Sequence, residues 1–484
     1  MKTGKCPDAD NIRPEHLKAG GLPLFKALAV RFSRYLNEKK TPAAWKNSRT
    51  ILLMKKGNPE NLSNYRPITL LSQIYKTFSR VVLNGITKDL DVFISREQAG
   101  FRRGYSTVDH IHTVRQLVEQ RVPDTSVPCI RRLQSFDSVE RNAVLNALDK
   151  CGVNPNDVDL LREMTTGCSM KIKLFSDPCY INICNGIRQG DTIFPKSFAV
   201  TLGTLFSELG WDGGIRVNGE RLTHLLFADN CVLFGHSGFE LQDKLLQLQI
   251  ESKKIGLEMN LSKTIWMRNS LCRRSRINTE GQIMEEVGSY VYLGHQLSFT
   301  DNIVGECSRR RNAAWSSFNR IRTLLFDANL PMKIKAELFH STIVPILLYG
   351  AECWPINKAV EDKLSVTQRS MERRIRKISL RDHVTSVEIL PRTGFTDVVQ
   401  EMFKRKRECA GHVAHIRDNR WTSRLICWDP LDRKRPRGRL KTRWADPMVK
   451  VFGRRWMQRA QDQKSWSEVD LRGWRMPRGR VGSR

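Results

Sequence analysis

Short apolar runs separated by turn-forming residues dominate the middle of the chain. Between residues 225 and 234, two apolar runs flank a single Ala228-Asp229-Asn230 step. This pattern predicts a β-hairpin with buried strands and with Asp229 and Asn230 at its tight turn. A carboxylate that is held on such a rigid turn can be aimed at a metal ion.

A second hairpin is predicted nearer the N-terminus. Residues 50–54 form an apolar, β-favouring run, residues 55–59 form a Lys-Lys-Gly-Asn-Pro turn, and residues 64–71 resume the apolar pattern. Two strands joined by a basic turn can reach over a phosphate chain. Arg66 lies on the second strand, where spacing alone would favour a surface ion pair.

Apolar residues recur at helical spacing in three further regions. These are Phe198, Leu202, Leu205 and Leu209; Leu241, Leu245 and Leu248; and Ala314, Phe318, Ile321 and Leu325. Gly210 and Gly256 are placed to end the first two helices, because glycine readily takes the left-handed conformation that follows a helix. Residues 257–264 then predict a strand that ends at Lys263.

The composition points to a polyanionic partner. The chain has 484 residues, a length that suits two to four domains, and its formal charge is +31 with a pI near 10. Nucleic acid is the first candidate, because cationic side chains displace the counterions condensed on phosphates. A membrane surface is the alternative, but no apolar run approaches the roughly 18 residues needed to cross a bilayer. The 12 cysteines show no framework spacing, which predicts reduced thiols in an intracellular protein.

Residues 401–484 concentrate both charge and tryptophan. They contain 24 Lys and Arg against 9 Asp and Glu, which leaves a net charge of +15. Six tryptophans also lie there: Trp421, Trp428, Trp444, Trp456, Trp466 and Trp474. Basic side chains between aromatic ones suit nucleic acid, with phosphates neutralised and bases stacked. The alternative is a solvated basic tail with a few packed tryptophans, in which residues 433–439 could serve as a nuclear-import signal.

One group of potential metal ligands lies in the same region. Cys409, His412, His415 and Cys427 are separated by two, two and eleven residues. Zinc sites do combine Cys and His, but this spacing fits no usual zinc finger closely. A packed turn at Gly411-His412 is the alternative.

Several motifs occur in the order found in reverse transcriptases of retrotransposons without long terminal repeats, in particular LINE-like elements of the RTE type. Residues 227–230 resemble that family's Phe/Tyr-x-Asp-Asp signature, with Asn230 in place of the second aspartate. The other matching stretches are Tyr-Arg-Pro-Ile at 65–68, Gln-Ala-Gly-Phe-Arg-Arg-Gly at 98–104, Gly-Ile-Arg-Gln-Gly at 186–190, Leu-Glu-Met-Asn-Leu-Ser-Lys-Thr at 257–264 and Tyr-Leu-Gly at 292–294. The resemblance extends over nearly the whole chain.

The resemblance implies a right-hand polymerase fold of the α+β class. It places fingers and a template-contacting region in residues 1–120, a palm with the catalytic motifs and the primer-grip hairpin in 121–300, and a helical thumb in 301–400. Residues 401–484 would form a basic, partly helical nucleic-acid-binding extension. The polymerase-like region begins almost at the first residue, so no endonuclease segment is expected before it.

The resemblance also implies roles for individual residues. Arg66 would grip the triphosphate of the incoming nucleotide, a task that suits a guanidinium fork. Lys263 would donate a proton to the leaving pyrophosphate, although a solvated surface lysine is the simpler alternative. The remaining assignments are Gln189 and Gly190 for the nucleotide and the new base pair, Arg102 and Arg103 for template phosphates, and Tyr292, Leu293 and Gly294 for the primer end.

The metal-binding acids depart from the family pattern. Two Mg²⁺ ions are held there by three carboxylates, of which one lies six residues before a Phe-Asp step. That step is Phe136-Asp137 here, so the position of the third acid falls on Arg131. An arginine charge about 4 Å from a divalent ion would cost up to about 8 kcal/mol, and Asn230 offers only a neutral carbonyl oxygen. Asp229 is the one expected metal ligand that remains.

The chain is therefore expected to be an RNA-directed DNA polymerase by resemblance, with impaired polymerisation. Mg²⁺ is the expected cofactor, and an RNA template with a DNA primer or duplex is the expected partner. Three alternatives stay open: an active polymerase that tolerates the substitutions, a folded nucleic-acid-binding relic without polymerase activity, and the translated product of a decaying element. Metal-dependent primer extension would separate the first from the other two.

Overall fold

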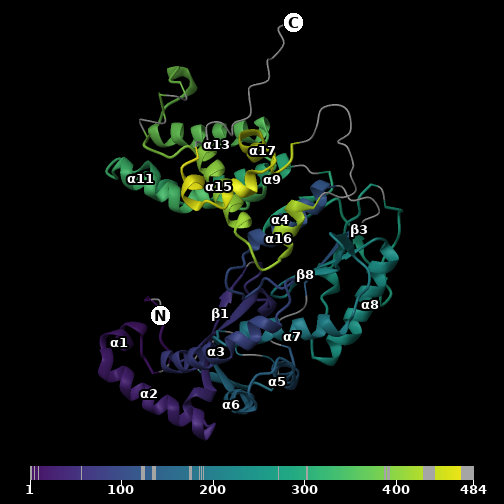
Figure 1. Cartoon of the computed structure of the whole chain (residues 1–484). Helices are drawn as coiled ribbons and strands as arrows, with labels where there is room; N and C mark the ends of the chain where they lie inside the picture. Colours follow the sequence, from purple (N-terminus) through teal and green to yellow (C-terminus); the bar gives the residue numbers. More distant parts are fainter. Residues whose placement is uncertain are drawn as a thin grey trace.

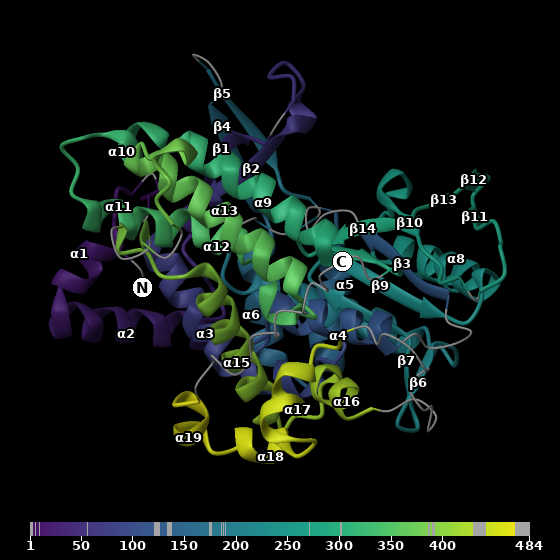
Figure 2. The same cartoon turned by 90° about the horizontal axis from the view of Figure 1, so that it is seen from above.

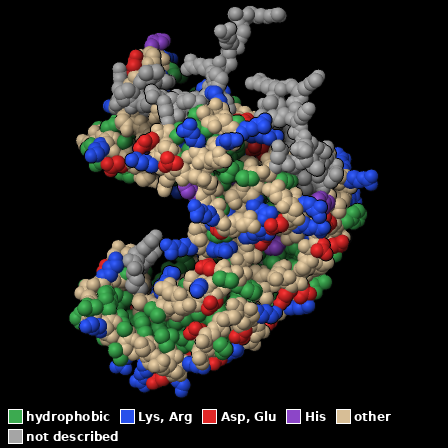
Figure 3. All heavy atoms as spheres, viewed as in Figure 1, with side chains coloured by type: hydrophobic (Ala, Val, Ile, Leu, Met, Phe, Trp, Pro, Cys, Tyr) green, Lys and Arg blue, Asp and Glu red, His purple; other side chains and the backbone are tan. Residues whose placement is uncertain are grey.

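Two lobes face each other across a deep hollow in the computed structural model of this chain (Figures 1 and 3). The lower lobe in Figure 1 contains the N-terminal residues, and the upper lobe contains the residues after about 300. The structure describes residues 3–4, 6–8, 10–55, 57–120, 126–132, 138–173, 177–184, 186, 188, 190–270, 272–300, 303–385, 388–389, 393–428 and 442–469.

A four-stranded sheet, the fingers sheet, lies in the lower lobe in the order β2-β1-β4-β5. Its strands are β1 (Asn47–Met54), β2 (Tyr65–Leu70), β4 (Ser169–Lys173) and β5 (Pro178–Asn182). The hairpin predicted at 50–71 is confirmed, because β1 and β2 pair antiparallel with Leu53 opposite Arg66. Ser48, Thr50 and Thr69 are buried on one face of this sheet, while Arg49, Leu53 and Arg66 on the alternate positions are exposed.

Helices of the lower lobe share one hydrophobic core with residues of the palm. They are α2 (Gly21–Glu38), α3 (Gln73–Phe93), α5 (Arg141–Lys150), α6 (Pro155–Thr165) and α7 (Phe194–Glu208), and α1 (Pro14–Ala19) contacts α2. The apolar stripe predicted on α7 is confirmed by Phe198, Leu202 and Leu205, all of which are buried. Gly210 follows the helix with a φ of +54°, as its position predicts.

The palm sheet has the order β13-β10-β3-β9-β8. Its strands are β3 (Ser126–Arg132), β8 (His224–Phe227), β9 (Asn230–Gly235), β10 (Ile265–Trp266) and β13 (Glu285–Glu286). Helices α4 (Thr107–Gln120) and α8 (Gly238–Lys254) pack against it. Figure 2 shows the palm sheet from above, with α4 between it and the C-terminal helices.

Three small hairpins complete the palm region. They are β6 (Ile215–Val217) with β7 (Glu220–Leu222), β11 (Asn278–Thr279) with β12 (Gln282–Ile283), and β14 (Ser289–Tyr292) with β15 (His295–Ser298). The strand predicted at 257–264 is wrong. Residues Leu261–Lys263 form a short 3-10 helix instead, because the side chain of Asn260 accepts a hydrogen bond from Lys263 N at 3.1 Å.

The upper lobe is helical. Its helices are α9 (Ile303–Arg320), α10 (Arg322–Phe326), α11 (Met332–Leu338), α12 (Val344–Leu347), α13 (Lys358–Arg376), α15 (Val398–Ala414), α16 (Trp421–Cys427), α17 (Asp446–Phe452), α18 (Trp456–Ala460) and α19 (Gln463–Ser467). Residues on both sides of position 400 share one hydrophobic core, which runs from Ile303 to Trp466. The thumb and the expected C-terminal extension are therefore packed together.

The expectation that tryptophans of residues 401–484 stack on bases is wrong for those that the structure describes. Trp421, Trp428, Trp444, Trp456 and Trp466 are all buried. Trp444 and Trp466 donate their indole N–H to Glu352 O at 2.6 Å and to Arg407 O at 2.9 Å. These side chains fill the protein core, so bases cannot reach them. Trp474 and the basic run at 433–439 lie outside the described residues.

The mixed sheets and helices confirm the predicted α+β class. Within the described residues, no helix has both the length and the apolar character that a membrane crossing requires. The cysteines whose side chains the structure describes are free thiols, in agreement with the prediction.

Candidate active site

The β8–β9 hairpin forms the centre of the candidate active site. Phe227 pairs with Asn230, so the two-residue turn consists of Ala228 and Asp229, and these two residues are called the catalytic turn below. The prediction that Asn230 belongs to the turn is wrong by one position, since Asn230 is the first residue of β9. Ala228 adopts a φ of +56°, which a side-chain-bearing residue rarely takes.

The catalytic turn is held from behind by residues 97–100. Ala99 N donates to Leu226 O at 2.9 Å, and Leu226 N donates to Glu97 O at 2.8 Å. The buried side chain of Gln98 accepts hydrogen bonds from Gly100 N at 2.8 Å and from Ala228 N at 3.3 Å. A Cβ on Gly100 would collide with Ala228 N, so glycine is needed for this close approach. The motif at residues 98–104 predicts contact with template phosphates, but its first residues, Gln98 to Gly100, support the catalytic turn.

Asp229 and Asn230 lie side by side and are both half-buried. Asn230 Nδ2 donates to Asp229 Oδ1 at 3.2 Å and to Phe227 O at 3.5 Å. The amide at position 230 thus supplies a donor to the carboxylate, where a second carboxylate would repel it.

Arg131 lies on β3, the central strand of the palm sheet. β3 pairs with β9, with Arg131 opposite Cys231 and Arg132 opposite Asn230. On its other edge β3 pairs with β10, where Ile130 is opposite Ile265. Residues directly opposite one another share a face of the sheet, so Arg131 belongs to the face of Cys231.

The residues at the catalytic turn do not fit the two-metal site that this chemistry uses. Such a site needs several anionic oxygens in an octahedral array. Here Asp229 supplies a carboxylate and Asn230 supplies an amide, and Arg131, which the resemblance assigns to the position of a third acid, lies on the neighbouring strand opposite Cys231. Among the described side chains, no group of three or more His, Cys, Asp or Glu residues is placed to hold a metal ion.

The residues expected to contact the nucleotide lie on the fingers side of the site. Arg66 is exposed on β2, and its side chain forms no hydrogen bond or ion pair with any residue that the structure describes. Gly190 has a φ of +111°, and a Cβ there would lie 2.7 Å from Thr69 O, so the loop passes directly against β2. The structure thus brings Gly190 and the strand of Arg66 together. Gln189 lies outside the described residues.

A buried polar network, which the sequence analysis missed, anchors this loop. Arg188 Nη2 donates to Tyr75 Oη at 2.6 Å, and Arg188 Nη1 donates to Trp45 O at 2.6 Å. Tyr75 Oη in turn donates to Asp191 Oδ2, and Asp191 lies 3.6 Å from Arg188. Burial opposes the charge of Arg188, but Tyr75 and Asp191 raise the pKa of its guanidinium above the ordinary value. The network fixes both ends of the Gln189-Gly190 step.

The two arginines expected at the template differ in their freedom. Arg102 Nη1 donates to Ser95 O at 2.9 Å, and its guanidinium lies 4.6 Å from the centre of the Tyr105 ring. Arg102 therefore fastens the loop to the end of α3. Arg103 is exposed and forms no ion pair with a described residue, so it remains available to a phosphate. The helix that follows this loop, α4, begins at Thr107.

The primer-grip motif forms the predicted hairpin, with Leu293 and Gly294 as the turn of β14–β15. Leu293 O accepts from Tyr349 Oη at 2.8 Å, and Gly294 O accepts from Arg309 and Arg310 of α9. The hairpin turn is thereby tied to the helical lobe. Tyr292 points into the core, with 1% of its surface exposed, so its side chain supports the hairpin from inside.

His110 of α4 links the catalytic and primer-grip hairpins. Its ring lies 6.0 Å from that of Phe227, and its Nδ1 is 3.3 Å from Tyr292 Oη. Burial lowers the pKa of His110 to about 4, so the ring is neutral at physiological pH. Lys263, by contrast, is an exposed residue of the 3-10 helix before β10, and no described contact draws it toward the turn.

The four Cys and His residues considered for zinc have separate surroundings. Gly411 and His412 lie inside α15, so the turn predicted there is wrong. His412 is 3.8 Å from Asp109, whereas His415 contacts Gly411 O at 2.7 Å and Gln461 O at 3.0 Å. Gly411 leaves room for the Trp466 ring, and this close helix packing accounts for the Gly-His step.

Comparison with known proteins defines the class. The family model described as "Reverse transcriptase (RNA-dependent DNA polymerase)" matches residues 53–297, which include the whole palm sheet, strands β2, β4 and β5 of the fingers sheet, and the turns of both hairpins of the candidate site. The chain therefore belongs to the reverse transcriptase family, and its fold is that of a right-hand polymerase.

The relatives narrow the class to retrotransposons. A transposon-derived protein of Caenorhabditis elegans is 35% identical over 274 residues, which are 53% of this chain and 97% of that protein. The RNA-directed DNA polymerase from mobile element jockey of Drosophila melanogaster is 25% identical over 77% of this chain and 42% of its own length. The Pol polyprotein of type-1 retrotransposable element R2 of Popillia japonica is 23% identical over 64% of this chain and 45% of its own length. The predicted resemblance to polymerases of elements without long terminal repeats is confirmed.

The chain spans less than half the length of the jockey and R2 proteins. Among solved structures, apo telomerase of Candida tropicalis aligns with 84% of this chain and 73% of its own, with a TM-score of 0.40 and 11% identity.

Proposed function

We propose that this chain binds an RNA template and a DNA primer in its hollow, and that it performs nucleotidyl transfer poorly or not at all. The observation that carries the proposal is the catalytic turn. Its hairpin and its supports are in place, yet Asn230 lies beside Asp229, and Arg131, at the position that the motif spacing assigns to the third acid, lies on the neighbouring strand opposite Cys231. The scaffold of a polymerase site thus remains, with one of its three acids.

We assign the nucleic-acid-binding surface to the exposed face of the fingers sheet. Register places Arg66 and Leu53 opposite one another, and Arg49 opposite Lys171. Arg49, Arg66, Lys171 and Lys173 share this face, all are exposed, and they are called the fingers face below. Figure 3 shows Lys and Arg side chains along the inner wall of the hollow. Phosphates that contact such side chains release counterions, which drives binding.

Mg²⁺ is the cofactor that the family chemistry requires, and Asp229 is the residue that would hold it. Mg²⁺ prefers anionic oxygens, so one carboxylate and one amide make a weaker site than three carboxylates. We expect binding of template and primer to persist without the metal. Residues 433–439 could direct the protein to the nucleus, where a DNA primer would be available.

Primer extension on an RNA template tests the catalytic part of the proposal. With Mg²⁺, incorporation by the unmodified chain should not exceed that of Asp229→Ala. The double variant Arg131→Asp with Asn230→Asp restores the acids and should raise incorporation by several decades, since about 1.4 kcal/mol corresponds to each decade.

A matched control moves one acid by one strand position. Arg132→Asp with Asn230→Asp carries the same charges. Residue 132 lies opposite Asn230, on the face of β3 away from residue 131, and the motif spacing assigns the acid to position 131, so this variant should not restore activity. Incorporation by the unmodified chain clearly above Asp229→Ala would refute the impairment. Equal incorporation by both double variants would refute the role of position 131.

A further inference from the structure

Residues 418–425, called the palm brace below, come soon after α15 in the chain, but Trp421 and Leu425 belong to a hydrophobic cluster of the palm. α16 packs against α4 of the palm, as Figures 1 and 2 both show. Arg420, Trp421 and Thr422 have at most 7% of their surface exposed. Outside the palm brace itself, the polar partners of these three side chains belong to residues 96–113, which precede and form α4.

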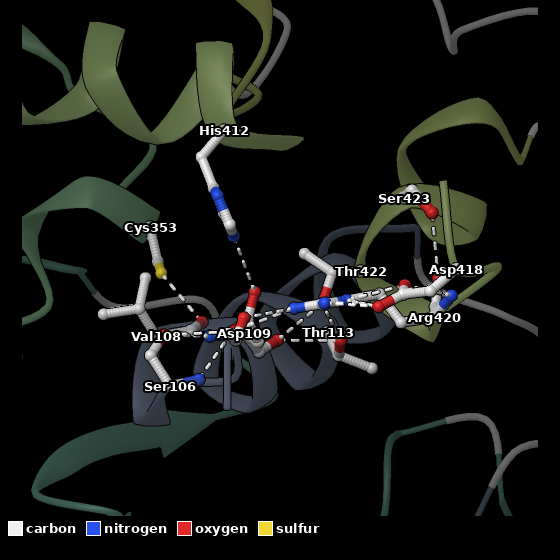
Figure 4. Close-up of polar contacts among 11 residues, drawn as sticks. Ser106, Val108, Asp109, Thr113, Cys353, His412, Asp418, Arg420, Thr422 and Ser423 are labelled. Atoms are coloured by element: carbon white, nitrogen blue, oxygen red, sulfur yellow. Dashed lines mark hydrogen bonds and ion pairs between the residues drawn. The ribbon is translucent and has the colours of Figure 1, made fainter. Parts of the chain in front are cut away.

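Asp109 is the first anchor of the palm brace (Figure 4). It accepts hydrogen bonds from Ser106 N at 2.7 Å and lies 3.7 Å from Arg420 Nη1. Thr422 Oγ1 donates to Asp109 O at 3.2 Å. Burial opposes the charge of Asp109, but hydrogen bonds from His412 and Ser106 and the charge of Arg420 lower the pKa of its carboxyl. The anchor is therefore an ionic one.

Arg420 also fixes the loop that precedes α4. Its Nη1 donates to Gly104 O at 2.8 Å, and its guanidinium lies 3.7 Å from the centre of the Tyr105 ring. The cation of Arg102 contacts the same ring at 4.6 Å. Cation–π contacts of this kind at a partly desolvated ring add to the hydrogen bond.

Trp421 connects the palm brace to the catalytic turn. Its indole N–H donates to Glu97 Oε1 at 2.9 Å. The carbonyl of the same Glu97 accepts from Leu226 N on β8, and the next residue, Gln98, accepts from Ala228 N. Two hydrogen bonds thus separate the palm brace from the backbone of the catalytic turn.

We propose that the palm brace is a positioning element for the catalytic turn, acting through Glu97 and Gln98. The inference deepens the proposed function, on which it rests. It assigns a conformational role to a stretch whose Trp and Arg residues suggested contact with nucleic acid. Because the palm brace follows α15 in the chain, it also joins the helical lobe to the palm next to the turn that carries Asp229.

Amide hydrogen exchange tests the proposal in the full chain without requiring activity. Trp421→Phe keeps an aromatic ring but removes the indole donor, and it should raise exchange at Leu226, Ala228 and Asp229 about tenfold, with exchange in α13 unchanged. Arg369→Ala is the matched control, because Arg369 is a buried cation of the helical lobe that contacts Glu372 and Asp397. It should raise exchange in α13 and leave the catalytic turn as it was.

A conservative pair at position 97 separates positioning from general loss of structure. Glu97→Gln keeps an oxygen acceptor for Trp421 and should retain slow exchange at the turn, whereas Glu97→Ala should match Trp421→Phe. Exchange at the turn that stays unchanged in Trp421→Phe, or that rises equally throughout the protein, would overturn the proposal. Loss of activity plays no part in this measurement, so its failure is distinct from failure of the proposed polymerase chemistry.

Where Arg131→Asp with Asn230→Asp supports primer extension, the kinetic constants give a second readout. Adding Trp421→Phe should then lower kcat about tenfold with the KM for nucleotide unchanged, since the nucleotide contacts lie on the fingers. A rise in KM with kcat unchanged would overturn the proposal.

Discussion

The fingers sheet and the C-terminal helices use cationic side chains in opposite ways. On the fingers sheet, Arg49 and Arg66 are exposed and form no ion pair with described residues. In the C-terminal helices, Lys406 is fully buried and donates to Trp354 O at 2.6 Å, and Arg420 is bound to Asp418 and Asp109. The two cations of the fingers sheet are thus exposed to a ligand, whereas the two cations of the C-terminal helices are bound to groups inside the protein.

This difference shows that a surplus of basic residues does not by itself identify a nucleic-acid-binding surface. Residues 401–484 have a net charge of +15, the densest in the chain, but several of their cations and all of their described tryptophans serve the core. The fingers sheet has fewer charges, yet four of them share one open face. Exposure and common orientation decide which charges can meet phosphate.

The largest effect is expected from removing a C-terminal tryptophan. Trp444 is fully buried, its indole donates to Glu352 O, and its ring meets His112 at 4.4 Å. Trp444→Ala should lower the free energy of unfolding by about 3–5 kcal/mol, because a large cavity replaces the ring. Thermal denaturation followed by circular dichroism measures the loss, and Arg66→Ala should leave the midpoint unchanged. An unaltered midpoint with weakened RNA binding would refute the assignment of Trp444 to the protein core, since it would place Trp444 at the ligand.

How far the sequence predicts these regions depends on the kind of signal. The apolar pattern correctly predicts the β8–β9 hairpin and the fingers hairpin, because each depends on neighbours along one or two strands. The turn itself is misplaced by one residue. Motif spacing does not reveal that the side chain of Gln98, 130 positions earlier in the chain, accepts a hydrogen bond from Ala228 N. This contact stabilises the positive φ of Ala228.

Long-range partners and burial lie beyond such reasoning. The Arg188–Tyr75–Asp191 network joins residues 113 and 116 positions apart, and no local pattern marks its members as partners. Tryptophan is equally suited to a core and to base stacking, so composition cannot choose between them. At Lys263, strand-like residues are overridden by the side-chain cap of Asn260.

The next largest effect is expected from neutralising the fingers face. Replacing Arg49, Arg66, Lys171 and Lys173 by Gln should reduce the slope of log K against log salt by about 3, since each phosphate contact contributes roughly 0.7–0.9. At about 0.1 M salt this corresponds to a loss of roughly three decades in affinity for an RNA–DNA heteroduplex. Fluorescence anisotropy at several salt concentrations gives both values.

The C-terminal helices offer a matched control with the same change in charge. Arg454, Arg455, Arg459 and Lys464 are exposed there, and their replacement by Gln should leave most of the slope intact. If this control lost as much affinity as the fingers variant, the C-terminal helices would be an equal part of the binding surface. Deleting residues 401–484 would not test this point, because α15 and several tryptophans belong to the thumb core.

A smaller effect on stability is expected from a change in pH, through the buried residue His112 of α4. Burial, with Lys406 and Arg115 adding to it, lowers the pKa of His112 to about 3, below an ordinary value near 6.5. Below pH 6.5 the histidine is therefore protonated in the unfolded chain but not in the folded chain. The free energy of unfolding falls as pH drops from 6.5 toward 3, by about 1.4 kcal/mol per pH unit. Buried His110 and His224, with pKa values of about 4, act in the same direction.

The variant His112→Phe tests this assignment. Between pH 7 and pH 5 it should lose about 2 kcal/mol less stability than the unmodified chain, because Phe cannot be protonated. His383→Phe, at an exposed position, should show the same pH dependence as the unmodified chain. Because His112 packs against Trp444, hydrogen exchange should show that acid opens the C-terminal helices before the fingers sheet. Opening in the reverse order would contradict it.

The smallest effect concerns the acids at the catalytic turn. Asn230→Asp removes the amide donor to Asp229 and places a second carboxylate beside it, at a half-buried site. Repulsion there should lower the free energy of unfolding by about 1 kcal/mol in the absence of metal, or roughly 2–4 °C in Tm. Millimolar Mg²⁺ should reverse the loss, since a cation bridges two carboxylates that otherwise repel. Asn230→Ala also removes the donor but adds no charge, so its Tm should not respond to Mg²⁺. A metal response in Asn230→Ala, or none in Asn230→Asp, would show that residue 230 does not face the position of a metal ion, and the impairment would then depend on Arg131 alone.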